Sequence, residues 1–145
     1  MCQSYQRITE ICLFSNPNAI AGDFYHTCAL LDNASVKCWG LNTFGQLGID
    51  NSTNEPSLIS GGEVAVLPVV NLGTGRTATA IAGGIYHSCA LLDNASVKCW
   101  GYNGYGQLGI RSNDMGDNTG EMAVLPSIDF SVMIQEDPPE EEEEE

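Results

Sequence analysis

Two segments of this 145-residue chain contain a histidine, a cysteine two residues later and a second cysteine ten residues after the first. Histidine and cysteine bind metals and act as nucleophiles, so the pattern raises the question of a site. A structural zinc site needs four ligands, and each segment supplies at most three, so another part of the chain would have to complete it. The alternative, which we favour, is that each histidine hydrogen-bonds to main chain near a turn. The residues are His26, Cys28 and Cys38, and then His87, Cys89 and Cys99.

The ten-residue spacing of the cysteines suits a β-hairpin, because the intervening DNAS consists of turn-forming residues. A turn centred on Asn33 places Cys28 opposite Cys38 and Leu30 opposite Val36, all on one face of the sheet. Opposed strand residues have Cα atoms about 4.5–5.5 Å apart, which is within disulfide range. A register shifted by one residue would instead oppose cysteine and tryptophan and leave buried free thiols. The candidate disulfide cysteines are Cys28 with Cys38, Cys89 with Cys99, and Cys2 with Cys12.

The chain is internally duplicated. Residues 19–49 align with 80–110 at an offset of 61, and only six of these 31 positions differ. Residues 62–72 match 120–130 at an offset of 58, so the connecting loop is three residues shorter in the second copy. A period near 60 is typical of one blade of a propeller or a comparable β unit. The second copy predicts four short strands, which are 77–84, 86–92, 96–102 and 123–130, the last broken by Pro126.

The pattern AGxxYHxCALL…VKCWGxNxxGQLG resembles the repeat of the RCC1-like (regulator of chromosome condensation) family. The resemblance covers about residues 19–130 in two copies, and it implies four-stranded blades that close into a β-propeller. One departure is that the glycine common at the hairpin turn of this family is Ala34 and Ala95 here. We therefore predict an all-β fold with two RCC1-type propeller blades, which form an incomplete ring or a fragment, and a disordered acidic C-terminal tail.

The residues of the motif that recur in both repeats are interpreted as structural. A glycine-rich loop can cradle phosphate, but phosphate motifs lead into a helix, and the sequence predicts none after GQLG. Each tryptophan could stack on a substrate, but a central strand position favours the core between blades. The residues with this structural role are His26, Trp39, Gly40, Gly45, Gln46 and Gly48 in the first repeat, and His87, Trp100, Gly101, Gly106, Gln107 and Gly109 in the second.

The chain divides into four segments. Residues 1–18 are a lead-in segment, either a blade remnant or unrelated to the repeats, and 19–72 and 73–133 are the first and second RCC1-like repeats. Residues 134–145 are the acidic tail. Residues 136–145 carry eight acidic groups, whereas residues 1–135 have eleven acidic against five basic residues, a net charge of −6. This mildly acidic body has no basic stripe, so we expect no direct nucleic-acid or membrane contact and a protein partner.

One loop of the second repeat could offer oxygen ligands to calcium through Asp114, Asp117, Asn118 and Glu121. The spacing of these residues does not match the EF-hand rule, and the composition is also typical of surface loops. We therefore predict no metal site, no cofactor and no catalytic residues.

The sequence favours a non-enzymatic scaffold for protein–protein interaction, because it shows no nucleophile paired with a base outside the structural motif. Two blades are fewer than the four to eight of a closed propeller, so we expect self-association or assembly with further blades. The resemblance implies a second function, which is a fragment of a guanine-nucleotide exchange factor for a small GTPase. A third alternative is a secreted, disulfide-stapled adhesive module, since paired cysteines favour an oxidising compartment, although the N-terminus lacks a signal-peptide pattern.

Overall fold

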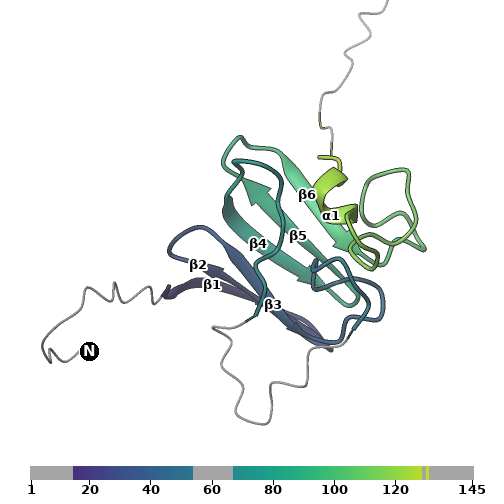
Figure 1. The fold of residues 1–145 in the computed structure, drawn as a ribbon, viewed down its shortest axis with the longest axis horizontal. Coiled ribbons are helices and arrows are strands. Elements are labelled where there is room, and N and C mark those ends of the chain that lie inside the picture. The colour runs from purple at the N-terminus through teal and green to yellow at the C-terminus, as the bar shows by residue number, and fades with distance from the viewer. Residues whose placement is uncertain (1–14, 54–66, 129, 131–145) are drawn as a thin grey trace, which may run out of the picture.

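The two repeats fold into two successive antiparallel sheets in a computed structural model that describes residues 15–53, 67–128 and 130. Each sheet has three strands in sequence order, and the second sheet packs against the first (Figure 1). A single helical turn, α1, follows the second sheet. The elements are β1 (Pro17–Gly22), β2 (His26–Leu31), β3 (Val36–Gly40), β4 (Ala78–Gly84), β5 (His87–Leu92), β6 (Val97–Gly101) and α1 (Glu121–Val124).

The central hairpin of each repeat has the predicted register. Cys28 pairs with Cys38 and Leu30 with Val36 across β2 and β3, and the same pairing recurs across β5 and β6. The turn between β2 and β3 is held by Asn33, whose Oδ1 accepts hydrogen bonds from the Ser35 amide at 3.1 Å and the Ser35 hydroxyl at 2.7 Å. Two of the three candidate disulfides are formed, Cys28–Cys38 and Cys89–Cys99, each with a Cα–Cα distance of 4.1 Å.

The predicted fourth strand of the second repeat is wrong. The first two residues of that segment, Ala123 and Val124, belong to α1. Ile128 makes only an isolated bridge with Val97, in which the Ile128 amide donates to the Val97 carbonyl oxygen at 2.7 Å. The equivalent residue of the first repeat, Val70, donates one bond of 2.9 Å to Val36. Pro126 has no amide hydrogen and cannot extend the ladder, so the outer position of this sheet holds a short bridge and not a strand.

Alternation along the hairpin strands gives each repeat two faces, which we name after one residue each. The cysteine face consists of His26, Cys28, Leu30, Val36 and Cys38 in the first repeat, and His87, Cys89, Leu91, Val97 and Cys99 in the second. The tryptophan face consists of Thr27, Ala29, Leu31, Lys37 and Trp39, and Ser88, Ala90, Leu92, Lys98 and Trp100. The pairs Thr27 with Trp39 and Ser88 with Trp100 fix this assignment.

The core lies where the cysteine face of the first repeat meets the tryptophan face of the second. Val36, Trp100, Leu47 and Leu108 are completely buried there and belong to one continuous apolar cluster. This junction is asymmetric, because two different faces meet. Each repeat therefore also has a face that its neighbour does not cover.

The third cysteine pair, Cys2 and Cys12, lies outside the described residues, as do most of the lead-in segment and the acidic tail. No helix within the described ranges is long and apolar enough to cross a membrane.

Candidate functional site

A serine–histidine pair lies buried between the repeats. Ser88 Oγ is 2.8 Å from His26 Nε2 and donates its proton to the Gln46 carbonyl oxygen at 2.9 Å. A hydroxyl has only one proton, so His26 Nε2–H must donate to Ser88. The histidine is therefore a donor to the serine and not its general base, and Ser88 is 1% exposed, so the pair is not a nucleophile–base arrangement. The pair instead fastens β5 to the first repeat.

The prediction that His26 bonds to main chain is wrong, since its partner is the Ser88 side chain. Its other ring nitrogen, Nδ1, is buried without a partner, as is the Gln46 side-chain amide nitrogen. Burial lowers the pKa of His26, and the nearby His87 lowers it further, while Asp23 partly opposes the shift. Burial also lowers the pKa of His87, again against the effect of Asp23. Both rings are therefore held toward the neutral form.

The disulfides leave no cysteine thiolate for a zinc site at the motif histidines. Each cysteine that follows a motif histidine is bonded to its hairpin partner, so neither offers a thiolate. Among the residues that the structure describes, no three His, Cys, Asp or Glu side chains lie close enough to share a metal ion.

The GQLG loop of the first repeat lies directly against the second repeat. Trp100 Nε1 donates to the Gln46 carbonyl oxygen at 3.0 Å. A Cβ at Gly48, whose φ is +65°, would lie 2.7 Å from the same indole nitrogen, and one at Gly45 would overlap the backbone of Gly116 and Asp117. These glycines permit close approach of the two repeats, and no helix begins in residues 49–53, the described residues that follow them.

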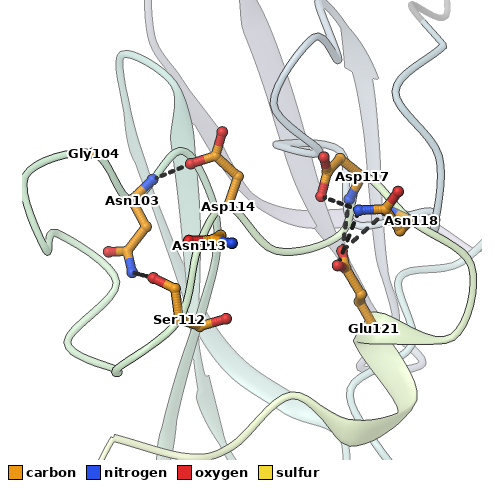
Figure 2. Close-up of a pocket in the computed structure, with 8 residues that line it drawn as sticks. All are labelled: Asn103, Gly104, Ser112, Asn113, Asp114, Asp117, Asn118 and Glu121. Atoms are coloured by element: carbon orange, nitrogen blue, oxygen red, sulfur yellow. Dashed lines mark hydrogen bonds between the residues drawn. The ribbon is translucent and has the colours of Figure 1, made fainter.

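An acidic pocket of about 590 Å³ opens beside the loop that contains Asp114, Asp117, Asn118 and Glu121 (Figure 2). Glu121 Oε2 accepts hydrogen bonds from the backbone amides of Gly116, Asp117 and Asn118 at 2.9, 3.2 and 3.1 Å. Across the pocket, Asp114 accepts from the Asn103 amide at 2.8 Å. The carboxylates of Asp114 and Glu121 therefore already accept hydrogen bonds from the loop backbone. The residues around the pocket are Asn103, Gly104, Ser112, Asn113, Asp114, Asp117, Asn118 and Glu121.

The pKa values of two carboxyls in this pocket, Asp117 and Glu121, are shifted in opposite directions. Burial raises the pKa of Asp117, and the neighbouring Glu121 raises it further. Burial also acts to raise the pKa of Glu121, but hydrogen bonds from Asn118 and the Gly116 amide outweigh it and leave that pKa below its usual value. Glu121 thus carries the negative charge on which the loop depends.

A row of aromatic rings follows one end of both sheets, and we call it the aromatic strip. Tyr25 and Tyr86 stack with centroids 5.8 Å apart, and Phe44 contacts Tyr86 and Tyr102 at 5.2 and 4.9 Å. Phe24 and Tyr105 end the row and are 77% and 89% exposed. The strip consists of Phe24, Tyr25, Phe44, Tyr86, Tyr102 and Tyr105.

The strip comes from equivalent loops in the two repeats, namely the turn before β2 or β5 and the loop after β3 or β6. A groove of about 520 Å³ at its second-repeat end is lined by Tyr86, His87, Tyr102, Tyr105 and Gln107, together with Phe44 and Ile85. Sequence reasoning did not single out these rings. The available signal was position, because they lie in the loops where the two copies differ.

The sheets, their shared register and the head-to-tail junction define this molecule as two consecutive blades of β-propeller type. The family model described as the regulator of chromosome condensation (RCC1) repeat matches residues 21–46 and 78–107, and a second model of that repeat matches residues 35–91. The chain therefore belongs to the RCC1 repeat family, and the predicted fold class is confirmed.

Several known proteins share these repeats. Protein pim1 of Schizosaccharomyces pombe is 32% identical over 95 residues, which are 66% of this chain and 17% of pim1. The human probable E3 ubiquitin-protein ligase HERC4 is 39% identical over 101 residues, which are 68% of this chain and 8% of HERC4. The crystal structure of human WBSCR16 matches 72% of this chain and 25% of its own with a TM-score of 0.57 and 23% identity. The chain thus spans less than a fifth of these two sequence relatives.

Proposed function

We propose that this chain is a non-enzymatic scaffold that binds a protein partner through the aromatic strip. The observation that supports this most is where the two copies diverge. Of the six differences between residues 19–49 and 80–110, four lie in the loops of this strip. A fifth, Asp23/Gly84, lies where the first of these loops begins, because Gly84 is the last residue of β4, and only Thr27/Ser88 lies inside a strand. The sheets are nearly identical, whereas the loops at this end have diverged, which is the distribution expected of a binding surface on a constant framework.

The chemistry of the strip suits a protein surface. Exposed aromatic rings that contact one another offer large, rigid, amphipathic area, and such residues are enriched at interface hot spots. The net charge of −6 over residues 1–135 favours a partner with basic groups around an apolar contact. Nucleic acid and anionic membranes, which are themselves negative, are disfavoured by the same charge.

The test is site-directed photocrosslinking in the source cells. A photoreactive phenylalanine at Phe24, which is exposed, should capture a defined partner protein. The matched control is the same group at Asn94, an exposed residue in the turn between β5 and β6. Capture that is equal at both positions, or absent at Phe24, would contradict the proposal.

Binding of the captured partner then provides a quantitative test. Replacing Phe24 or Tyr25 by alanine should weaken affinity by about 30-fold, which corresponds to an aromatic hot spot of about 2 kcal/mol. An unchanged affinity in both variants would place the interface elsewhere on the molecule.

The family resemblance implies a second function, exchange of guanine nucleotide on a small GTPase. Release of a fluorescent GDP analogue from a panel of small GTPases tests this directly. Accelerated release that is lost in the Tyr25→Ala variant would support exchange through the strip. Binding without acceleration would support the scaffold alone.

The two hairpin disulfides favour the third alternative, a secreted module stapled by cysteines. Mass spectrometry of alkylated, non-reduced protein from its native source distinguishes the cases. Linked Cys28–Cys38 and Cys89–Cys99 peptides would support an oxidising compartment, and reduced cysteines would contradict it.

A further inference from the structure

The two faces left open in this molecule are complementary to each other. The junction between the repeats joins the cysteine face of the first repeat to the tryptophan face of the second, as the contacts of Ser88 with His26 and with Cys28 Sγ show. The first repeat therefore still presents a tryptophan face, and the second repeat still presents a cysteine face. No described residue of the chain packs on either in the way the junction does.

Exposure of equivalent residues marks these open faces. On the cysteine faces, Leu91 is 40% exposed, whereas Leu30 is 6% exposed, and Val97 is half-buried where Val36 is fully buried. On the tryptophan faces, Thr27 and Trp39 are half-buried where Ser88 and Trp100 are fully buried. Ala29 and Leu31, at 4% and 9% exposed, are buried in the first repeat as well, so the open tryptophan face is confined to its Thr27–Trp39 end. Except at Thr27 and Ser88, these side chains have the same types in both repeats, and all have the same register, so the differences reflect their different surroundings among the described residues.

The loops show the same asymmetry. Gln46 is completely buried under the second repeat, but Gln107 is half-buried. Gly45 has no room for a side chain, whereas a Cβ at Gly106 would meet nothing within 4 Å. Tyr105 is 89% exposed, and its equivalent, Phe44, packs on Tyr86 and Tyr102 of the second repeat.

We propose that a second copy of this chain docks head to tail on the first. The tryptophan face of its first repeat packs on the open cysteine face of the second repeat. In this junction Trp39 Nε1 donates to the Gln107 carbonyl oxygen, as Trp100 does to Gln46. Thr27 donates its hydroxyl proton to the same carbonyl and accepts from His87, as Ser88 does between Gln46 and His26.

The occupant is a second copy because the chain already contains both halves of the contact. The segment CALLDNASVKCWG is identical in the two repeats, and Thr27 retains the hydroxyl of Ser88. One contact is lost, because Arg111 stands where Asp50 accepts a hydrogen bond from the Met122 amide at 2.8 Å. The junction between copies is therefore weaker than the one within the chain, and assembly depends on protein concentration.

A head-to-tail contact leaves the same two faces open after each addition. Such heterologous interfaces give rings when the rotation closes and open chains when it does not. The inference concerns surfaces other than the tip of the aromatic strip. Ile85, the equivalent of Phe24, remains 47% exposed at the internal junction, so Phe24 stays accessible after docking and the two proposals can be tested separately.

The test uses two variants of the full chain with its disulfides intact. Leu91→Glu places a charge on the open cysteine face, and Thr27→Glu places one on the open tryptophan face. Sedimentation velocity over a wide concentration range should show oligomers for the unmodified chain and monomers for each variant. The charge, buried without a partner, should weaken docking by about 100-fold or more. The control Val124→Glu, on a 76% exposed residue of α1, should assemble like the unmodified chain.

The mixture of the two variants tests the head-to-tail geometry. Each variant has one intact face, and these two faces are complementary, so an equimolar mixture should form dimers and stop there. A symmetric contact between like faces would make only one of the two variants monomeric, and the other would still assemble on its own. An unmodified chain that stays monomeric, variants that still assemble, or a mixture that stays monomeric would each overturn the proposal. Thermal unfolding equal to that of the unmodified chain, measured at a concentration low enough for the unmodified chain to be monomeric, verifies that the variants fold. Leu91→Lys and Thr27→Lys replace any variant that does not.

Discussion

Ser88 and Thr27 are equivalent residues with different surroundings. Ser88 is buried and bonds to both Gln46 and His26, whereas Thr27 is half-buried on the open face. We expect Ser88→Ala to lower the free energy of unfolding by about 1–3 kcal/mol, because it leaves the buried His26 Nε2–H donor without an acceptor. Thr27→Ala should change it by less than about 0.5 kcal/mol in dilute solution. Urea denaturation of both variants measures the difference, and equal losses would contradict the assignment of the junction.

His26 makes the stability of the fold depend on pH. Its folded pKa lies below the ordinary value of 6.5, so below that pH the unfolded chain binds a proton that the folded chain does not. Stability should therefore be greatest above pH 6.5 and fall as the pH drops below it. Urea denaturation between about pH 7.5 and 5.5 measures the slope. His26→Gln should reduce the slope and leave the contribution of His87, whose pKa is also lowered. An unchanged slope in that variant would contradict the role of His26.

Substitutions at Glu121 and at Asp117 should have unequal effects on the stability of this loop. Glu121→Gln removes a carboxylate that accepts three backbone hydrogen bonds, so it should destabilise the loop and speed hydrogen exchange at residues 116–118. Asp117→Asn removes a charge that its surroundings disfavour, and it should leave stability unchanged or slightly higher. Because the folded pKa of Glu121 is lowered, its contribution is present above pH 4.5 and is lost as the pH falls below that value. Equal exchange rates in both variants would contradict this role of Glu121.

At the scale of the element, the hairpin turns contain a strained residue. Ala34 and Ala95 adopt φ values of +62° and +64°, a region that favours glycine. We expect Ala95→Gly to raise the free energy of unfolding by about 0.5–1 kcal/mol, as relief of this strain outweighs the added freedom of the unfolded chain. Ala90→Gly, in the middle of β5 with ordinary strand geometry, is the matched control and should destabilise. Thermal unfolding of the two variants should therefore shift in opposite directions.

The sequence predicted the hairpins well because their signals are local. Turn residues at DNAS and the alternation of apolar residues determine the register that pairs Cys28 with Cys38. The structure of residues 123–130 was not predicted correctly, because it depends on contacts with residues far away in the sequence. Pro126 restricts hydrogen bonding, and Met122 is buried by packing α1 on the first repeat, where its amide bonds to Asp50. Such packing overrides the weak strand preference of this segment.

At the scale of the whole molecule, the candidate site was less predictable than the fold. The motif residues are the ones that the sequence makes conspicuous, yet they form the junction between repeats. The aromatic strip is assembled from four loops, and nothing local in any one loop shows that Phe44 will lie against Tyr86 and Tyr102. Only the three-dimensional arrangement of the two repeats brings these rings together. The differences between the two copies indicate which loops carry the candidate site, but they do not predict how the aromatic rings are arranged there.

The unequal burial of the two tryptophans gives the molecule an optical reporter. Trp100 is shielded and Trp39 is half-buried, and the chain contains no other tryptophan. Iodide should therefore quench one fraction of the intrinsic fluorescence and spare the rest, and Trp39→Phe should remove the quenchable fraction. An emission that is quenched uniformly would show that the two environments are alike. Without any label, the emission of Trp100 reports whether the two repeats remain packed together. The emission of Trp39 reports whether a partner covers the open tryptophan face of the first repeat.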